Sequence, residues 1–241
     1  MINDRMTMKE EDVLDFNFWP SFADLMLSLV LILVIVVFLV RAVIAAGTVN
    51  LKHVQENQGK MVRAIAAEYG VEPKEKHPDV FVIRIPLEGG RSSEITIQNE
   101  PTLQRLSFKD RVLFPSDNYL LSETGQETLL IVGREIKRQL SFIREIQIQG
   151  HADTDITYKF PSNLHLAALR AIEVFNFLQH DVGIDPAAHL MSATSFGEFK
   201  PVQRSNDDDS TYNREKLRQH NLSDALKDQN RRIEILLFYR F

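Results

Sequence analysis

The longest run of hydrophobic positions lies near the N-terminal end of the chain. Residues 22–40 are all apolar except for Asp24 and Ser28. A helix of that length spans about 28 Å, close to the hydrocarbon thickness of a bilayer, about 30 Å. The pattern predicts one transmembrane helix over residues 19–46, preceded by a short polar tail, residues 1–18.

The span contains a single carboxylate. An acid that faces lipid costs about 3 kcal/mol or more, so such a residue is a candidate for function. Asp24 and Ser28 are four positions apart and therefore share one face of the helix. We predict that this pair handles a translocated ion. The alternative is that Asp24 lies in the first helical turn, at headgroup level, where an acid favours the helix dipole.

The next segment has an amphipathic pattern. Between residues 48 and 69, apolar side chains recur at helical spacing, at Val54, Met61, Val62, Ile65 and Ala66. This pattern indicates a helix. Gly70 and two prolines then end it. We interpret residues 47–79 as a helical stalk that emerges from the membrane and continues as a charged linker.

From residue 80 onward, strand and helix patterns alternate. Strands are predicted at 81–85, 94–97, 103–108, 143–149, 190–196 and 232–239, and helices at 122–139 and 163–179. The first two strands flank Glu88-Gly89-Gly90-Arg91 and form a β-hairpin extension over residues 80–102. Residues 203–229 are polar and read as an inserted loop with a short helix. The order predicts an α/β domain with helices on one face of a sheet.

Composition narrows the function classes. The 241 residues carry a net charge of −5 with a mean hydropathy of −0.17, which provides no basic field for nucleic acid. The absence of cysteine excludes disulfides, thiolate metal sites and an N-terminal lipidated cysteine. No nucleophile–base pair or metal-ligand set is visible. His151 lacks a second histidine at ligand spacing, and the acidic triplet Asp207–Asp209 is interpreted as a solvated loop, so we expect no enzyme activity and no cofactor.

Two alternatives concern the N-terminal segment. Ala45-Ala46-Gly47 resembles a signal-peptide cleavage site, but the preceding flank is acidic and the apolar run exceeds a signal core of 7–15 residues. The positive-inside rule favours a cytoplasmic C-terminus, because more basic residues follow the span than precede it. The motifs of the C-terminal domain, described next, favour the opposite orientation, with the C-terminus outside the cytoplasm.

The motifs of that domain carry a resemblance to a known family. They are, in chain order, Leu113–Ser116, Leu121–Gly125, Gly150–Asp153, Asn163, Leu166-Ala167, Arg170-Ala171, Gly197, Pro201 and Asn230–Ile235. Together they resemble the OmpA-like peptidoglycan-binding domain over residues 103–241. The chain has Ala152 where the family usually has threonine, and residues 155–162 and 203–229 depart from its compact form.

The resemblance implies a set of binding residues. Asp153 and Arg170 match family positions that contact the diaminopimelate group of a peptidoglycan stem peptide. An acid and a guanidinium that converge on one pocket suit a ligand with both ammonium and carboxylate groups. Asn163, Leu166 and Arg231 match positions at or near that pocket. The alternative is that Asp153 and Arg170 form an ion pair that only ties loop to helix.

The two ends of the chain together are similar to the B subunits of ion-driven stators of the MotB type. Trp19, Ala23, Asp24 and Met26 match the W-x-x-x-A-D-x-M segment of that family. The resemblance implies a single-pass bacterial inner-membrane protein with a cytoplasmic N-terminus and a periplasmic C-terminal domain. It also implies a homodimer inside a ring of multi-span A subunits (MotA- or ZorA-like), with Asp24 carrying H⁺ or Na⁺. The segment is most similar to ZorB, the B component of Zorya anti-phage defence systems. A flagellar stator and a passive membrane-to-wall tether are the alternatives.

Overall fold

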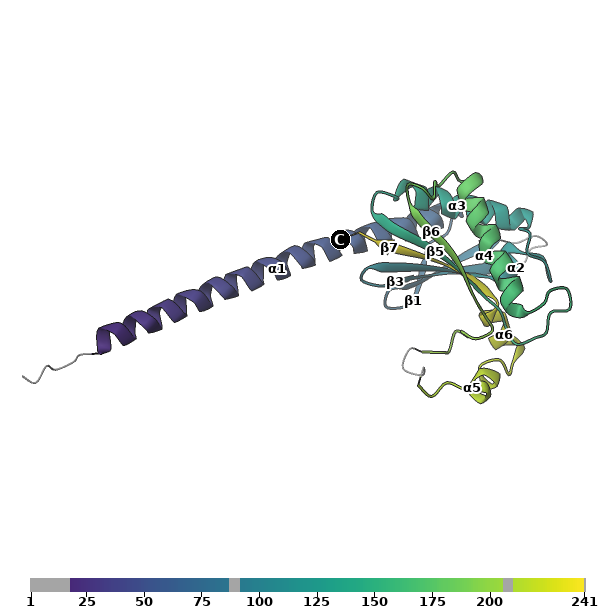
Figure 1. Cartoon of the computed structure of the whole chain (residues 1–241). Helices are drawn as coiled ribbons and strands as arrows, with labels where there is room; N and C mark the ends of the chain where they lie inside the picture. Colours follow the sequence, from purple (N-terminus) through teal and green to yellow (C-terminus); the bar gives the residue numbers. More distant parts are fainter. Residues whose placement is uncertain (1–17, 87–91, 206–209, 241) are drawn as a thin grey trace, which may run out of the picture. The chain divides into compact units, whose positions relative to one another are not determined.

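The computed structural model describes residues 18–86, 92–205 and 210–240 (Figure 1). The chain divides into two compact units, with the boundary after Thr48. The polar tail, the hairpin turn at 87–91 and the acidic triplet Asp207–Asp209 lie outside the described residues.

The first unit contains the start of helix α1, which runs from Trp19 to Glu68. Its first part, Trp19–Ile44, has a mean hydropathy of 3.2 and is long and apolar enough to cross a membrane. Its 26 residues extend about 39 Å. None of this segment is buried inside the protein. Length and composition thus agree with the predicted span, while its insertion in a membrane stays a prediction.

Asp24 lies within the second turn of α1. The helix begins at Trp19, and its first turn contains no acidic residue. The first-turn position that the alternative gave Asp24 is therefore wrong, while the ion-handling role of Asp24 stays a prediction. Asp24 and Ser28 are both exposed, as are all residues from 18 to 44, and lie four positions apart on the same helix.

The second unit is built on one seven-stranded sheet in the order β1-β2-β3-β4-β7-β5-β6. The strands are β1 (Lys74–His77), β2 (Val80–Pro86), β3 (Ser92–Asn99), β4 (Leu103–Lys109), β5 (Ile143–His151), β6 (Leu190–Gly197) and β7 (Arg232–Tyr239). β5 and β6 pair in parallel, and every other neighbouring pair is antiparallel. The predicted hairpin is present as β2 and β3.

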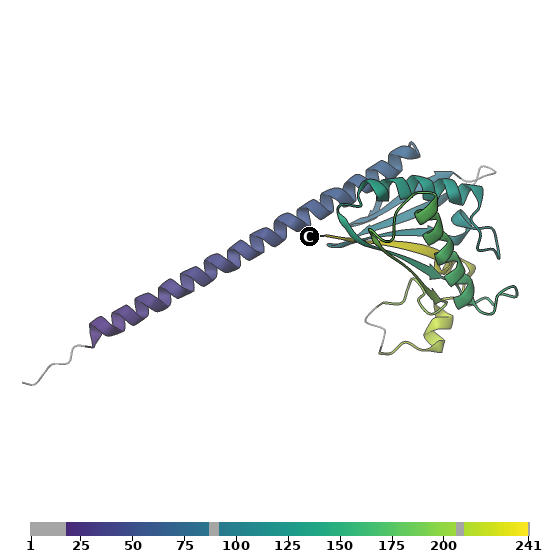
Figure 2. The same cartoon turned by 45° about the horizontal axis from the view of Figure 1, so that its top comes forward.

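The helices of this unit alternate with the strands as predicted. They are α2 (Asp110–Leu113), α3 (Glu123–Arg138), α4 (Asn163–His180), α5 (Arg214–Gln219) and α6 (Asp224–Asn230). Figures 1 and 2 show α3 and α4 on one face of the sheet, where alternate residues of the central strands are buried. Serines cap both helices: Ser122 accepts from the Gly125 amide, and Ser162 from the His165 amide.

The segment expected to be a free stalk belongs to the core of this unit. Met61 and Ile65 are fully buried, and Val54 and Val62 are 2% exposed. Gln58 adds polar contacts, because its Nε2 donates to the backbone oxygens of Glu100 (2.8 Å) and Leu103 (3.1 Å). The amphipathic pattern predicted the helix correctly, but its apolar face covers the sheet instead of remaining available outside the domain.

The charged segment after this helix also differs from the expected linker. Lys74–His77 forms edge strand β1, and Lys74 lies opposite Val82 in β2. Charged residues suit an edge strand, because they discourage pairing with other chains. The inserted loop contains two short helices, α5 and α6, where one was expected. Asn230 fixes its end by donating to the oxygens of His220 and Asn221.

A glycine at the end of β5 permits the close approach of α4. A Cβ at Gly150 would lie 2.1 Å from the backbone oxygen of Ala167. Real Cβ atoms do not approach that closely, so only glycine allows this contact. As a result, the N-terminal half of α4 lies directly against the strand end that leads to Asp153.

Candidate functional site

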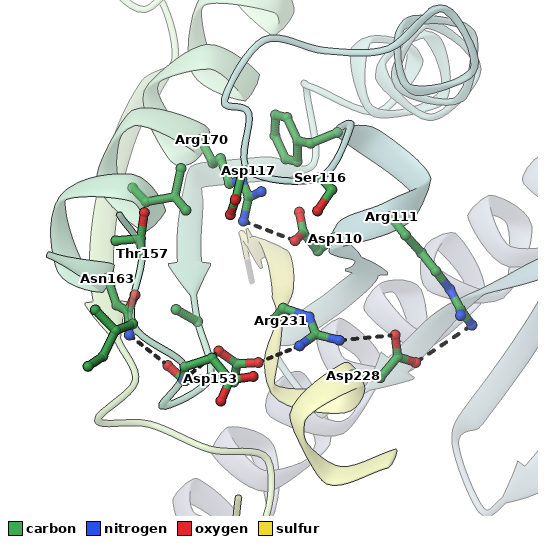
Figure 3. A pocket seen from close by; sticks show the side chains of 15 residues that line it. Asp110, Arg111, Ser116, Asp117, Asp153, Thr157, Asn163, Arg170, Asp228 and Arg231 are labelled. Carbon is green, nitrogen blue, oxygen red and sulfur yellow. Dashed lines mark hydrogen bonds and ion pairs between the residues drawn. The ribbon is translucent and has the colours of Figure 1, made fainter. Parts of the chain in front are cut away.

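A cavity of about 490 Å³ lies where β4, β5 and β7 meet the start of α4 (Figure 3). All five residues predicted to bind peptidoglycan line it, namely Asp153, Asn163, Leu166, Arg170 and Arg231. Asp153 follows β5, three of the others lie on α4, and Arg231 precedes β7. The structure thus brings together residues from positions 153 to 231 of the chain.

Asp153 is held by groups of the protein. It is 4% exposed and forms an ion pair with Arg231. Its Oδ1 accepts a hydrogen bond from the Asp155 amide at 3.0 Å. Asn163 donates to the backbone oxygen of Asp153 at 3.0 Å, which fixes the loop on α4.

Arg170 is held in a different set of contacts. Its Nη1 lies 3.0 Å from Oδ2 of Asp110, and its Nε donates to the Asn118 oxygen at 2.8 Å. The guanidinium lies 5.2 Å from the ring centre of Phe114. Asp153 and Arg170 therefore share the cavity, but they are not paired with each other. The predicted alternative of an Asp153–Arg170 ion pair does not describe this arrangement.

Asp110 is a cavity residue that the sequence did not reveal. Its Oδ1 is buried and has no hydrogen-bond partner within the described structure. Burial raises the pKa of Asp110 to about 6, although the cations Arg170 and Arg231 act in the opposite direction. Asp110 reaches the cavity because β4 pairs with β7, so that its amide donates to the Arg231 oxygen at 2.9 Å. This pairing joins Asp110 to Arg231, 121 positions further along the chain, and local sequence patterns contain no such relation.

Asp228 connects the basic residues on the other wall. Its carboxylate lies 2.8 Å from Lys109 Nζ, 3.6 Å from Arg111 Nη2 and 3.8 Å from Arg231 Nη2. The cavity lining includes five aspartates, at 110, 117, 153, 155 and 228, and three arginines, at 111, 170 and 231. A site with both kinds of charge is suited to a zwitterionic ligand, since carboxylates attract ammonium groups and guanidinium groups attract carboxylates.

His151 is close to this cavity in sequence but lies in another environment. It is 2% exposed and stacks on Phe196 with ring centres 5.3 Å apart. Burial lowers its pKa to about 4, and Glu234 partly offsets this. Among the described residues, no group of three or more His, Asp or Glu side chains is arranged to hold a metal ion.

The shifted pKa values of Asp110 and His151 predict how the free energy of unfolding changes with pH. Asp110 stabilises the fold below its ordinary pKa of 3.8, and this contribution is lost as the pH rises to about 6. His151 acts in the opposite sense, because its contribution is lost as the pH falls from 6.5 to about 4. Asp110→Asn should therefore make the free energy of unfolding rise more steeply with pH, by about 3 kcal/mol between pH 3.8 and pH 6.

Urea denaturation of the full chain in detergent, at a series of pH values, measures this effect. His151→Gln is the matched control, since it removes the opposing contribution and should make stability fall with rising pH. Identical profiles for the unaltered chain and Asp110→Asn would show that Asp110 has no raised pKa.

Comparisons with known proteins agree with this architecture. Residues 113–215 match the model of the OmpA family. A MotB-like protein from Desulfovibrio vulgaris has a TM-score of 0.58 and 20% identity, covering 81% of this chain and 99% of that chain. The periplasmic domain of MotB has a TM-score of 0.51 and 17% identity, covering 73% and 82%.

No curated protein matches this chain in a sequence comparison. At identities of 17–20%, the likeness to the solved structures concerns the fold. The chain thus consists of one N-terminal apolar helix, long enough to cross a membrane, and a mixed α/β OmpA-like domain with the fold of MotB-like proteins.

Proposed function

We propose that this chain is the peptidoglycan-anchored B subunit of an ion-driven stator complex in the bacterial inner membrane. The observation that carries the proposal is the mixed-charge cavity on an OmpA-like fold. The N-terminus would lie in the cytoplasm and the domain in the periplasm. The apolar helix Trp19–Ile44 supports this single-pass topology.

The cavity supplies groups that suit a diaminopimelate-containing stem peptide. Arg170 and Arg231 would bind its carboxylates, since a guanidinium fork matches a carboxylate. Asp153 and the unpaired Oδ1 of Asp110 would accept its ammonium group. Asn163 holds the Asp153 loop, and Leu166 contributes apolar surface to the wall.

Ion handling is assigned to the N-terminal helix. A single helix with one polar stripe, Asp24 and Ser28, cannot line a path alone, so the proposal requires partner helices. We propose a homodimer of this chain inside a ring of multi-span A subunits, with Asp24 carrying H⁺ or Na⁺. Anchoring the domain to the wall would hold the dimer still while the ring turns.

We propose that the complex belongs to a Zorya-type anti-phage defence system. This proposal rests on the segment Trp19–Met26, which differs from the usual tyrosine-containing flagellar form. A flagellar stator is the second candidate, favoured by the likeness in fold to MotB-like proteins. The genes beside this one separate the two, because a flagellar cluster would favour the second.

Binding to isolated cell wall tests the central claim. The full chain in detergent should sediment with purified peptidoglycan sacculi that contain diaminopimelate. Asp153→Ala should weaken this binding about tenfold or more, because it removes a charge-assisted contact to the ammonium group and the ion pair that positions Arg231. Asp181→Ala, an exposed acid at the far end of α4, is the matched control and should bind normally. Normal binding by Asp153→Ala would contradict the proposed site.

A further inference from the structure

The loop between β5 and α4 forms one rim of the cavity and has an unusual exposure pattern. Thr157 lines the cavity (Figure 3), and its hydroxyl is buried with no hydrogen-bond partner in the described structure. On one side of it, Ile156 also lines the cavity although it is 75% exposed, and on the other side Tyr158 is 93% exposed. Because consecutive Cα atoms are 3.8 Å apart, Tyr158 begins one residue from the cavity wall.

This loop is fastened on both sides of Tyr158. On one side, Lys227 Nζ lies 2.5 Å from Oδ1 of Asp155. On the other side, Phe160 packs edge-on against Tyr119, with ring centres 6.1 Å apart. The exposed tyrosine is therefore carried on a segment with fixed ends, which lowers the entropy cost of binding a ligand through its ring.

Further exposed apolar surface lies nearby. Leu120 is 51% exposed and adjoins Tyr119, whose ring contacts the same loop through Phe160. We define the rim patch as Leu120, Ile156 and Tyr158. A single exposed apolar side chain on a surface needs no explanation, but Ile156 lines the polar cavity and Tyr158 follows two residues later on the same loop, so we treat the rim patch as a candidate binding surface.

The chemistry of the ligand in the proposed function identifies what would occupy this patch. A stem peptide is attached through a lactyl ether to an amino sugar of the glycan strand, and two residues separate this sugar from diaminopimelate. The alanine extends about 3.6 Å and the γ-linked glutamate, whose chain contains two additional carbons, about 6 Å, so a peptide seated in the cavity holds its sugar within about 10 Å, which is enough to reach the rim. A pyranose ring presents a face of C–H groups, which packs on an aromatic face. The tyrosine hydroxyl can form hydrogen bonds with the hydroxyl groups of the sugar.

We propose that Tyr158 and its rim patch are a carbohydrate subsite that stacks the N-acetylated amino sugar attached to the stem peptide. The inference rests on the proposed function and extends it. The domain would recognise the junction of glycan and peptide and would not recognise the peptide alone. Ile156 and Leu120 would contact the N-acetyl methyl group and the lactyl methyl group.

Two probes separate the subsites in a titration of the full chain in detergent. One is the free tripeptide L-Ala-γ-D-Glu-diaminopimelate, and the other is the same tripeptide on its N-acetylglucosamine–N-acetylmuramic acid disaccharide. We expect the disaccharide form to bind more tightly than the free tripeptide. Tyr158→Ala should weaken the disaccharide form about five- to tenfold and leave the free tripeptide unchanged. Tyr158→Trp should retain the preference.

Phe142→Ala is the matched control, because Phe142 is also exposed but precedes β5 at the end of the strand opposite the cavity. It should leave both affinities unchanged. Equal affinities of the unaltered chain for the two probes, or an equal effect of Tyr158→Ala on both, would overturn the carbohydrate subsite while the stem-peptide site stands. Failure of the unaltered chain to bind either probe would overturn the proposed function together with this inference.

Discussion

Asp24→Asn is expected to reduce ion-driven activity to background while the chain still inserts and assembles. Asparagine has nearly the same shape as aspartate, but it neither takes up a proton nor carries the negative charge that attracts a cation. Asp24 is exposed in the second turn of α1, within the apolar segment, so its side chain is open to a partner helix. An ionised carboxylate in such a segment costs free energy in a membrane, so it usually pairs with another group or has a function.

Ion flux into proteoliposomes that contain this chain and its A subunit measures the effect. Copurification of the two chains, compared between variants, shows whether assembly is intact. Ser28→Ala is the matched control: it lies on the same face but does not titrate, so flux should persist, with a changed preference between H⁺ and Na⁺ at most. Normal flux through Asp24→Asn would contradict ion coupling at this residue.

Alanine variants at the two ends of the chain, Asp24→Ala and Asp153→Ala, separate a stator from a passive tether. A tether needs the helix only as an anchor, so Asp24→Ala would keep full activity in cells while Asp153→Ala would lose it. A stator needs both ends of the chain. Loss of activity in each variant, with normal wall binding by Asp24→Ala, is the result that our proposal requires.

The cavity residues on α4 were predicted from the resemblance to the OmpA-like domain, and their local spacing agrees with that prediction. Asn163, Leu166 and Arg170 are three and four positions apart, so any helix through them places them on one face. Asp153 ends the preceding strand and therefore lies at the same edge of the sheet. Asp110 was not predictable in this way. It enters the cavity through the pairing of β4 with β7, and the linear sequence does not state which strands pair.

The same limit explains the two differences in fold. The helical spacing of Val54, Met61 and Ile65 predicted a helix with an apolar face. The spacing alone does not indicate which surface that face packs against. Lys74–His77 lacks the apolar alternation of a half-buried strand, since all four residues are exposed. It forms a strand because β2 offers an unpaired edge, which is again a non-local cause.

Arg170→Ala is expected to have the largest effect in the soluble domain. The substitution removes the cation 3.0 Å from Asp110 and leaves a carboxylate whose other oxygen is already buried and unpartnered. Breaking one side of a buried ion pair costs about 3–5 kcal/mol of stability.

The loss of stability should be smaller near pH 4 than at pH 7, because the raised pKa of Asp110 favours its neutral form at low pH. Thermal unfolding followed by circular dichroism measures the loss of stability. Arg134→Ala is the control, because Arg134 is exposed, and it should change stability by less than about 0.5 kcal/mol.

A second substitution then separates stability from binding. Asp110→Asn in the Arg170→Ala background removes the unpaired charge and should restore most of the lost stability. It cannot restore the guanidinium fork, so affinity for the stem tripeptide should stay about a hundredfold below that of the unaltered chain. Recovery of both stability and binding in the double variant would mean that Arg170 serves only to neutralise Asp110. Recovery of stability alone would identify Arg170 as a group that contacts the ligand.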